Sequence, residues 1–208
     1  SFEQLDVPLA QRVRQIELAL ERLRWLPPLR SEKAVVINIP EFRLRALEVS
    51  DGAAAVRLGM NIIVGRALVT QTPMFIGSMR HVEFSPYWNV PASIARKEII
   101  PKLRRDPAYL AREEMEFVGA GGVTTEVSEE NLEALARGEL RVRQRPGPRN
   151  ALGGIKFVLP NDMDVYLHHT PSVRLFAQSR RDFSHGCIRV EAPVELAKFV
   201  LAGQQEWN

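Results

Sequence analysis

The side chains best suited to chemistry lie close together near the C-terminus, between residues 166 and 189. This stretch contains the single cysteine of the sequence, Cys187, and three of its four histidines, His168, His169 and His185. A lone thiol among imidazoles is the composition of a cysteine nucleophile and its base. We therefore predict a reactive cysteine in this stretch.

A thiol with an ordinary pKa of about 8.5 is mostly protonated at neutral pH, so Cys187 would need a base. His185 lies two residues earlier, and in an extended segment both side chains would point to one face. His168 ends a predicted strand, and the fourteen residues from 170 to 183 are enough to fold the chain back beside it. His169 would point to the opposite face, which makes its side chain the weakest candidate.

The backbone around the thiol could also take part. Gly186 has no Cβ, so the chain could approach a substrate closely there. The N–H groups of Gly186 and Cys187 could form an oxyanion hole, in which each donor lowers the barrier by roughly 3 kcal/mol. The second nitrogen of a histidine base needs an acceptor, for which we expect a backbone carbonyl near His169. These features predict acyl transfer through a thioester.

Two other interpretations of Cys187 remain open at this point. A single buried cysteine is often an inert small hydrophobic residue. Three histidines and a cysteine could also bind zinc, although their spacing matches none of the usual paired patterns.

The elements that must position these residues are mainly strands. β-branched or alternating runs bounded by turn residues occur at residues 34–39, 43–49, 55–64, 74–76, 81–84, 155–159 and 165–168. Helical periodicity appears at residues 8–25 and 193–201, and in an interruption of the β pattern at about residues 89–138. Within that interruption, Pro101 and Pro107 predict two short helices, and Ser128 is a candidate cap for a third.

The predicted fold class is therefore mostly β, a barrel or sandwich, with an inserted helical capping subdomain and flanking helices, α+β overall. We expect residues 1–30 to form a linker helix from a missing upstream region and residues 31–208 to form the catalytic domain. Within it, residues 89–138 would form a lid.

Charge and composition argue against two classes of protein, those that bind nucleic acid and those that span a membrane. The net charge is +3 and the arginines are scattered, which argues against nucleic acid as a partner. No apolar run reaches the roughly eighteen residues of a membrane span.

Three arginines, Arg141, Arg143 and Arg145, alternate along the chain, which indicates either a solvated edge strand or a rim that binds carboxylates. The chain starts at Ser1 without a signal-peptide pattern, so we expect any export signal or anchor upstream.

Beyond spacing, the chain resembles a known family. His168, then fifteen residues, then Ser184-His185-Gly186-Cys187 is similar to the signature of the L,D-transpeptidase (YkuD-type) catalytic domain. Further segments resemble the large Gram-negative, YcbB-type branch, which carries a helical capping subdomain. These segments are residues 37–44, 61–65, 84–91, 94–98, 150–153 and 166–168.

The resemblance implies specific roles. Cys187 would be the nucleophile and His168 the base, and the carbonyl of His169 would complete the triad. His185, Gly186 and Cys187 would shape the oxyanion hole. Substrate contacts would come from the five residues Arg189, Ser184, Tyr166, Trp88 and Asn89. The family often has glycine, serine or aspartate where His169 stands, so a side-chain role there is in doubt.

The implied reaction acts on peptidoglycan. The thiolate would attack the diaminopimelate–D-alanine bond of a tetrapeptide stem, release D-alanine and pass the acyl group to a side-chain amine of a neighbouring stem, giving a 3→3 crosslink. No metal or organic cofactor is implied. The implied partners are donor and acceptor stems, carbapenem-type β-lactams as covalent inhibitors, and cell-wall synthesis proteins. The implied location is the periplasm, with an inner-membrane anchor in the full-length protein.

Alternatives remain. The same acyl-enzyme could use an outer-membrane protein lysine, a free D-amino acid or water as acceptor. A non-catalytic peptidoglycan-binding domain with an inert thiol would keep the groove without the chemistry.

Overall fold

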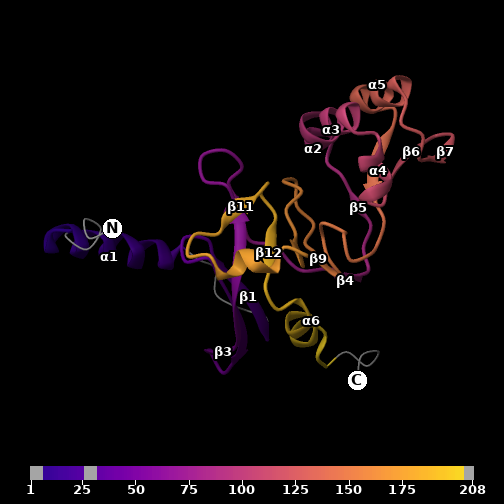
Figure 1. Cartoon of the computed structure of the whole chain (residues 1–208). Coiled ribbons are helices and arrows are strands. Elements are labelled where there is room, and N and C mark those ends of the chain that lie inside the picture. The colour runs from indigo at the N-terminus through magenta and orange to yellow at the C-terminus, as the bar shows by residue number, and fades with distance from the viewer. Residues whose placement is uncertain (1–6, 26–31, 204–208) are drawn as a thin grey trace.

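A computed structural model describes residues 7–25 and 32–203 of the chain (Figure 1). A β domain forms the body, and a smaller subdomain stands on one side of it. Helix α1 (Leu9–Arg24) projects from the other side and buries none of its residues. None of the described helices is long and apolar enough to cross a membrane.

The β domain is built on one large sheet with the strand order β1-β2-β3-β12-β10-β9-β4. Its strands are β1 (Lys33–Asn38), β2 (Arg43–Ser50), β3 (Ala53–Gly65), β4 (His81–Phe84), β9 (Ile155–Val158), β10 (Leu167–His168) and β12 (Ile188–Val190), and β11 (Asp182–Ser184) pairs with β3 alone. Two pairings are parallel, β10 with β12 and β11 with β3. Both lie where the predicted reactive stretch folds back onto the sheet.

The core of this domain follows the predicted alternation. Leu44 and Ala46 on β2 are fully buried, whereas the alternate residues Arg43, Arg45 and Leu47 are only partly covered. Helix α6 (Pro193–Leu201) adds Leu196 to the same core. Phe157 and Leu167, from neighbouring strands, complete the packing beneath the end of β10. His168 therefore stands on a rigid strand rather than on a free loop.

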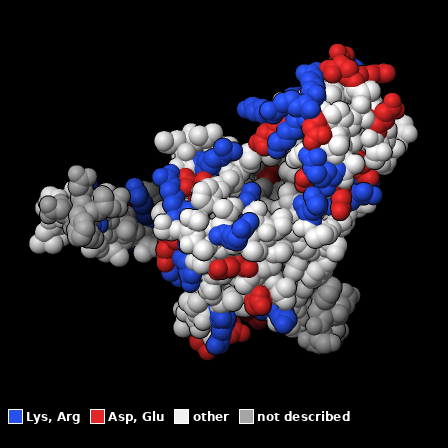
Figure 2. All heavy atoms as spheres, viewed as in Figure 1, with Lys and Arg blue, Asp and Glu red and all other residues white. Residues whose placement is uncertain are grey.

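The inserted subdomain, residues 88–144, is called the cap here. It has its own four-stranded sheet, ordered β5-β8-β6-β7, and its own apolar core. Its elements are β5 (Trp88–Asn89), α2 (Ala92–Ile94), the π-helical turn η2 (Ala95–Ile99), α3 (Ile100–Arg105), α4 (Ala108–Arg112), β6 (Met115–Gly119), β7 (Gly122–Thr124), α5 (Glu129–Arg137) and β8 (Arg141–Gln144). Figure 2 shows that Lys and Arg side chains gather on the cap, with acidic residues among them.

The structure departs from three expectations about strands. The insertion is not only helical, because strands flank and divide its helices. No strand forms at residues 74–76, where Met74 and Ile76 are largely exposed in an extended loop. The arginine-rich segment β8 is not an edge strand but lies between β5 and β6. There Arg143 pairs with Glu116 at 2.6 Å, so this arginine is occupied within the cap.

Pro101 does not break the helical run as expected. Residues 92–105 stay helical, and the wide π-helical turn η2 ends two residues before the proline. Proline lacks an N–H and clashes with the carbonyl four residues earlier, so a wider turn at this point relieves both problems. Pro107, by contrast, does separate α3 from α4. The π turn also carries Glu98, which matters for the site below.

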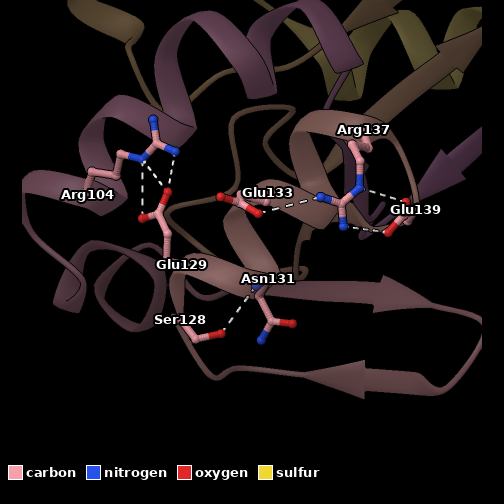
Figure 3. A network of polar contacts seen from close by, with 7 residues as sticks. All are labelled: Arg104, Ser128, Glu129, Asn131, Glu133, Arg137 and Glu139. Carbon is pink, nitrogen blue, oxygen red and sulfur yellow. Dashed lines mark hydrogen bonds and ion pairs between the residues drawn. The ribbon is translucent and has the colours of Figure 1, made fainter.

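Helix α5 begins as predicted (Figure 3). The Ser128 hydroxyl accepts a hydrogen bond from the Asn131 N–H at 3.2 Å, which is the expected N-cap contact. The helix ends at Gly138, whose φ of 85° is left-handed. Arg104 pairs with Glu129 and fastens α5 to α3, and Arg137 pairs with Glu139. These ion pairs are exposed, so we expect each to contribute little stability.

Candidate active site

The predicted base lies on one strand of a parallel pair, and the predicted nucleophile directly precedes the other. In the parallel pair of β10 and β12, His168 lies opposite Arg189, and the Ile188 N–H donates to the Tyr166 carbonyl at 3.0 Å. Cys187 directly precedes β12, so the parallel register places it beside Tyr166, which directly precedes β10 and lies two residues before His168. The connecting segment, which contains the 3₁₀ helix η3 (Val173–Ala177), folds back as expected.

His168 is held as a neutral, oriented ring. Its side chain is buried, and Nδ1 donates to the His169 carbonyl at 2.5 Å, which leaves Nε2 as the basic nitrogen. Burial lowers the pKa of His168 to about 3, and the positive charge of Arg189 acts in the same direction. The carbonyls of His169 and Leu152 oppose this shift. The ring is therefore uncharged throughout the physiological range.

The Cys187 thiol is half-buried and donates a hydrogen bond to a backbone carbonyl. Its Sγ donates to the Asp164 carbonyl at 3.5 Å, and within the described residues no hydrogen bond joins Sγ to the His168 ring. Burial raises the pKa of the thiol, and hydrogen bonding to Tyr166 opposes the rise. The resting pair is therefore a neutral thiol and a neutral imidazole. Catalytic hydrogen bonds are often long before substrate binds, so this geometry is compatible with proton transfer in a complex.

Tyr166 connects the thiol, the base and the cap. Its ring lies 5.7 Å from the His168 ring, centroid to centroid, and Lys156 Nζ lies 4.8 Å from its centroid on the ring face. Burial, and then Cys187, raise the pKa of the Tyr166 hydroxyl, whereas Trp88 acts in the opposite direction. Since Trp88 belongs to β5, these two predicted groove residues do come together, one from each part of the molecule.

Ser184 holds the turn that precedes the nucleophile. Its side chain is buried, and its hydroxyl accepts from the Gly186 N–H at 3.1 Å and donates to the Cys187 carbonyl at 2.6 Å. We had expected Ser184 to contact substrate, but these bonds favour a role within the turn. The Gly186 N–H is therefore already hydrogen-bonded to the Ser184 hydroxyl. The Cys187 N–H makes no hydrogen bond with any described residue, so of the two N–H groups predicted to bind an oxyanion it is the free one.

His185 contacts the cap instead of the thiol. Its Nε2 lies 2.7 Å from Glu98 Oε1 on the π turn and 3.1 Å from Arg66 Nη2, just after β3. The extended run that would place His185 and Cys187 on one face does not form, because Gly186 has a φ of +124°. The geometry therefore favours His168 over His185 as the base.

Arg189 offers an unsatisfied cation beside the thiol. Its Nε is buried and has no hydrogen-bond partner among the described residues. Burial lowers the pKa of the guanidinium, and the nearby Cys187 opposes the shift. An unpaired polar group of this kind is costly unless a ligand satisfies it. A carboxylate would fit it in charge and shape.

Asn89 and His169, the remaining predicted site residues, lie at the edge of the site. Asn89 is exposed on β5, opposite Arg143 in the cap sheet. His169 Nδ1 accepts from the Gly154 N–H at 3.2 Å, and the ring helps to line a cavity of about 270 Å³. Within the described residues, no group of three or more histidine, cysteine or acidic side chains is arranged to hold a metal ion.

Sequence reasoning missed several residues that shape the site. Thr70 and Thr72, from the loop after β3, donate to the carbonyls of Ser184 and Gly186 at 2.9 and 2.7 Å. Glu98 and Arg66 hold His185, as described above. All of them lie far from Cys187 in sequence. The one available signal was Gly65, which, with Pro73, brackets that loop.

Comparison with known proteins shows the family of the chain. A sequence model of the L,D-transpeptidase catalytic domain, the YkuD family, matches residues 32–206. A Haemophilus influenzae protein named "Putative L,D-transpeptidase" is 29% identical over 188 residues, which cover 90% of this chain. The aligned part is 37% of the length of that relative.

Proposed function

Because the chain belongs to the YkuD family of L,D-transpeptidase catalytic domains, we propose that it crosslinks peptidoglycan through a cysteine acyl-enzyme. The observation that carries the proposal is the parallel pairing of β10 with β12. Cys187 directly precedes β12, and β10 ends on the buried His168, whose Nδ1 is fixed by the His169 carbonyl. Opposite His168 lies Arg189, whose buried Nε has no hydrogen-bond partner among the described residues. A nucleophile, an oriented base and an anion site are the parts that acyl transfer from a peptide requires.

In the first half-reaction, His168 Nε2 takes the proton from the thiol as Sγ attacks the third-residue carbonyl of a tetrapeptide stem. The tetrahedral oxyanion is stabilised by the Cys187 N–H. When the C–N bond breaks, the imidazolium returns the proton to the departing D-alanine amine, and a thioester remains on Cys187. Arg189 holds a carboxylate of the donor during this step.

In the second half-reaction, an amine from a neighbouring stem attacks the thioester. His168 removes a proton from that amine, the C–S bond breaks, and the thiolate takes the proton back. The product is an amide between two diaminopimelate residues, the 3→3 crosslink. The neutral imidazole of the resting pair is the form that can accept a proton at the start of each half-reaction.

The cap, residues 88–144, acts in this proposal as a cover for the donor groove, with Trp88 and Tyr166 as its lining and Asn89 at its rim. We place the protein in the periplasm, with an inner-membrane anchor outside the sequence given and with cell-wall synthesis proteins as partners. Carbapenems would acylate Cys187.

The deciding experiment is mass spectrometry of the products formed from purified tetrapeptide-stem muropeptides. We expect released D-alanine and a dimer with a 3→3 linkage, and neither product with Cys187→Ala. A tripeptide product would instead indicate water as acceptor, and an exchanged terminal residue would indicate a D-amino acid. The wild-type protein with bound muropeptide but no product would support a non-catalytic binding domain.

A carbapenem gives an independent check on the thiol. The intact mass of the wild-type protein should rise by one inhibitor molecule, and that of Cys187→Ala should stay unchanged. An unmodified wild-type protein would contradict the acyl-enzyme.

A further inference from the structure

We propose that Thr72 is a positioning residue that orients the oxyanion-binding N–H of Cys187. This inference rests on the proposed function, because it concerns the group that would stabilise the acylation oxyanion. Thr72 lies in the loop after β3, more than a hundred residues before the nucleophile, and its side chain is buried at 7% exposure.

The Thr72 hydroxyl joins two backbone groups. It accepts a hydrogen bond from the Gly65 N–H at 2.9 Å and donates one to the Gly186 carbonyl at 2.7 Å. Gly65 is the last residue of β3. The hydroxyl therefore ties the end of a central strand to the turn that carries the nucleophile.

The second bond fixes the direction of the catalytic N–H. The Gly186 carbonyl and the Cys187 N–H belong to one planar trans peptide, so their bonds point in opposite directions. Holding the oxygen on the Thr72 side turns the Cys187 N–H toward the opposite side. Gly186 has a φ of +124° and no Cβ, so its own conformational preferences would fix this peptide only weakly. Thr72 supplies the constraint that Gly186 lacks.

Gly65 makes this arrangement possible. A Cβ at this position would lie 1.9 Å from the Thr70 carbonyl oxygen and 2.8 Å from the Thr72 nitrogen. Only glycine lets the loop pack this closely against β3 and reach the nucleophile turn. The contact is therefore built into the fold at both ends, which distinguishes it from an incidental loop contact.

Thr70 provides a matched control on the same loop. Its hydroxyl donates to the Ser184 carbonyl at 2.9 Å, so it anchors the same turn through a different peptide. Thr70→Val removes one hydrogen bond to the turn, as Thr72→Val does, but does not free the peptide that contains the Cys187 N–H.

The test compares Thr72→Val, Thr72→Ser and Thr70→Val with the wild type in tetrapeptide turnover. Loss of an oxyanion donor costs about a hundredfold or more in kcat, so misdirection of the donor should lower kcat by roughly ten- to a hundredfold in Thr72→Val. KM should change little. Thr72→Ser, which keeps the hydroxyl, should stay within about threefold of wild type. Thr70→Val should lose much less than Thr72→Val.

Alkylation of Cys187 by iodoacetamide separates this effect from damage to the thiol, because the reaction forms no oxyanion. Its rate should be the same in Thr72→Val and wild type. The inference would be overturned by undiminished turnover in Thr72→Val, by equal losses in Thr72→Ser or Thr70→Val, or by a parallel loss of alkylation.

A readout without substrate keeps the two proposals distinguishable. The amide nitrogen resonance of Cys187 responds to hydrogen bonding at the Gly186 carbonyl of the same peptide, so it should shift in Thr72→Val and much less in Thr70→Val. If the wild type produced no crosslink while this difference held, the proposed function would fail and the positioning role would stand. Equal shifts in the two variants would overturn the positioning role whatever the reaction is.

Discussion

His185 Nε2 lies 2.7 Å from Glu98 Oε1, a contact that joins the nucleophile turn to the π-helical turn of the cap. Both side chains are roughly one-third exposed, so the bond itself should be weak. It nevertheless links the turn that carries Cys187 to the subdomain that carries Trp88. This relationship motivates the first prediction.

Glu98→Ala should loosen the cap over the site. An exposed ion pair is worth up to about 1 kcal/mol, so we expect at most a roughly fivefold rise in donor KM, with little change in melting temperature. Hydrogen exchange across residues 95–105 should increase. Glu129→Ala, which breaks an exposed pair within the cap alone (Figure 3), is the control and should leave KM unchanged.

A double-mutant cycle tests whether the contact works as a pair. His185→Ala and Glu98→Ala should each raise KM, and the double variant should be no worse than the more affected single variant. Fully additive effects would show that the two residues act separately.

The thiol should titrate above its ordinary range. Burial raises the pKa of Cys187, so the iodoacetamide rate should reach half its maximum above about pH 8.5. Tyr166 opposes that rise, so Tyr166→Phe should shift the midpoint further upward and slow alkylation at pH 8. A midpoint well below 8.5 would reveal a preformed thiolate–imidazolium pair and contradict the neutral resting state.

The buried His168 should make stability depend on acid. Its folded pKa of about 3 lies below the unfolded value near 6.5, so the unfolded chain binds the proton first. Stability is then unaffected above pH 6.5 and falls as the pH drops from 6.5 toward 3. From pH 7 to pH 5 the loss should be about 2 kcal/mol. Denaturant unfolding at both pH values measures it.

His168→Asn is the matched variant for that measurement. An asparagine amide can donate to the His169 carbonyl from the position of Nδ1 but does not titrate. This variant should not show the loss of about 2 kcal/mol in unfolding free energy between pH 7 and pH 5 that is due to His168. The contributions of the other ionisable groups cancel when the two proteins are compared. The substitution should also abolish turnover, since asparagine has no basic nitrogen. Identical pH dependence in the two proteins would show that His168 is not protonated on unfolding.

Arg189→Gln should weaken binding of the donor stem. Loss of a hydrogen-bonded charge costs about 1.5–3 kcal/mol, so kcat/KM should fall roughly ten- to a hundredfold, mainly through KM. Arg57→Gln, at an exposed arginine of the β2–β3 hairpin, is the control. Stems with amidated carboxylates should remove the difference between Arg189→Gln and wild type. A persistent difference would mean that Arg189 acts on the thiol and not on the substrate.

Ser128→Ala should destabilise the cap locally. Loss of the N-cap bond to Asn131 costs about 1 kcal/mol, which should appear as faster hydrogen exchange in α5. Ser128→Asp keeps a capping oxygen and should behave as wild type. Faster exchange spread evenly over the whole chain would show that the cap and the β domain unfold as one unit.

The sequence by itself determined where the candidate reactive residues and the local elements lie. Cys187, His168 and the glycine between His185 and Cys187 predicted a nucleophile, a base and a close backbone approach. Alternation in residues 43–49 predicted β2, and Ser128 predicted the start of α5. These features depend on side-chain type and on neighbours a few residues apart, so they can be read along the chain.

The tertiary structure alone decided which groups are free and which are engaged. Local spacing predicted that His185 would share a face with Cys187, but the left-handed Gly186 and the distant Glu98 turn it to the cap. The Ser184 hydroxyl is already hydrogen-bonded within its own turn. Thr72 reaches Gly186 across 114 residues, through a gap that exists only because Gly65 has no side chain. Such contacts depend on how β3, β10 and β12 pack side by side, and no periodicity in the sequence encodes that packing.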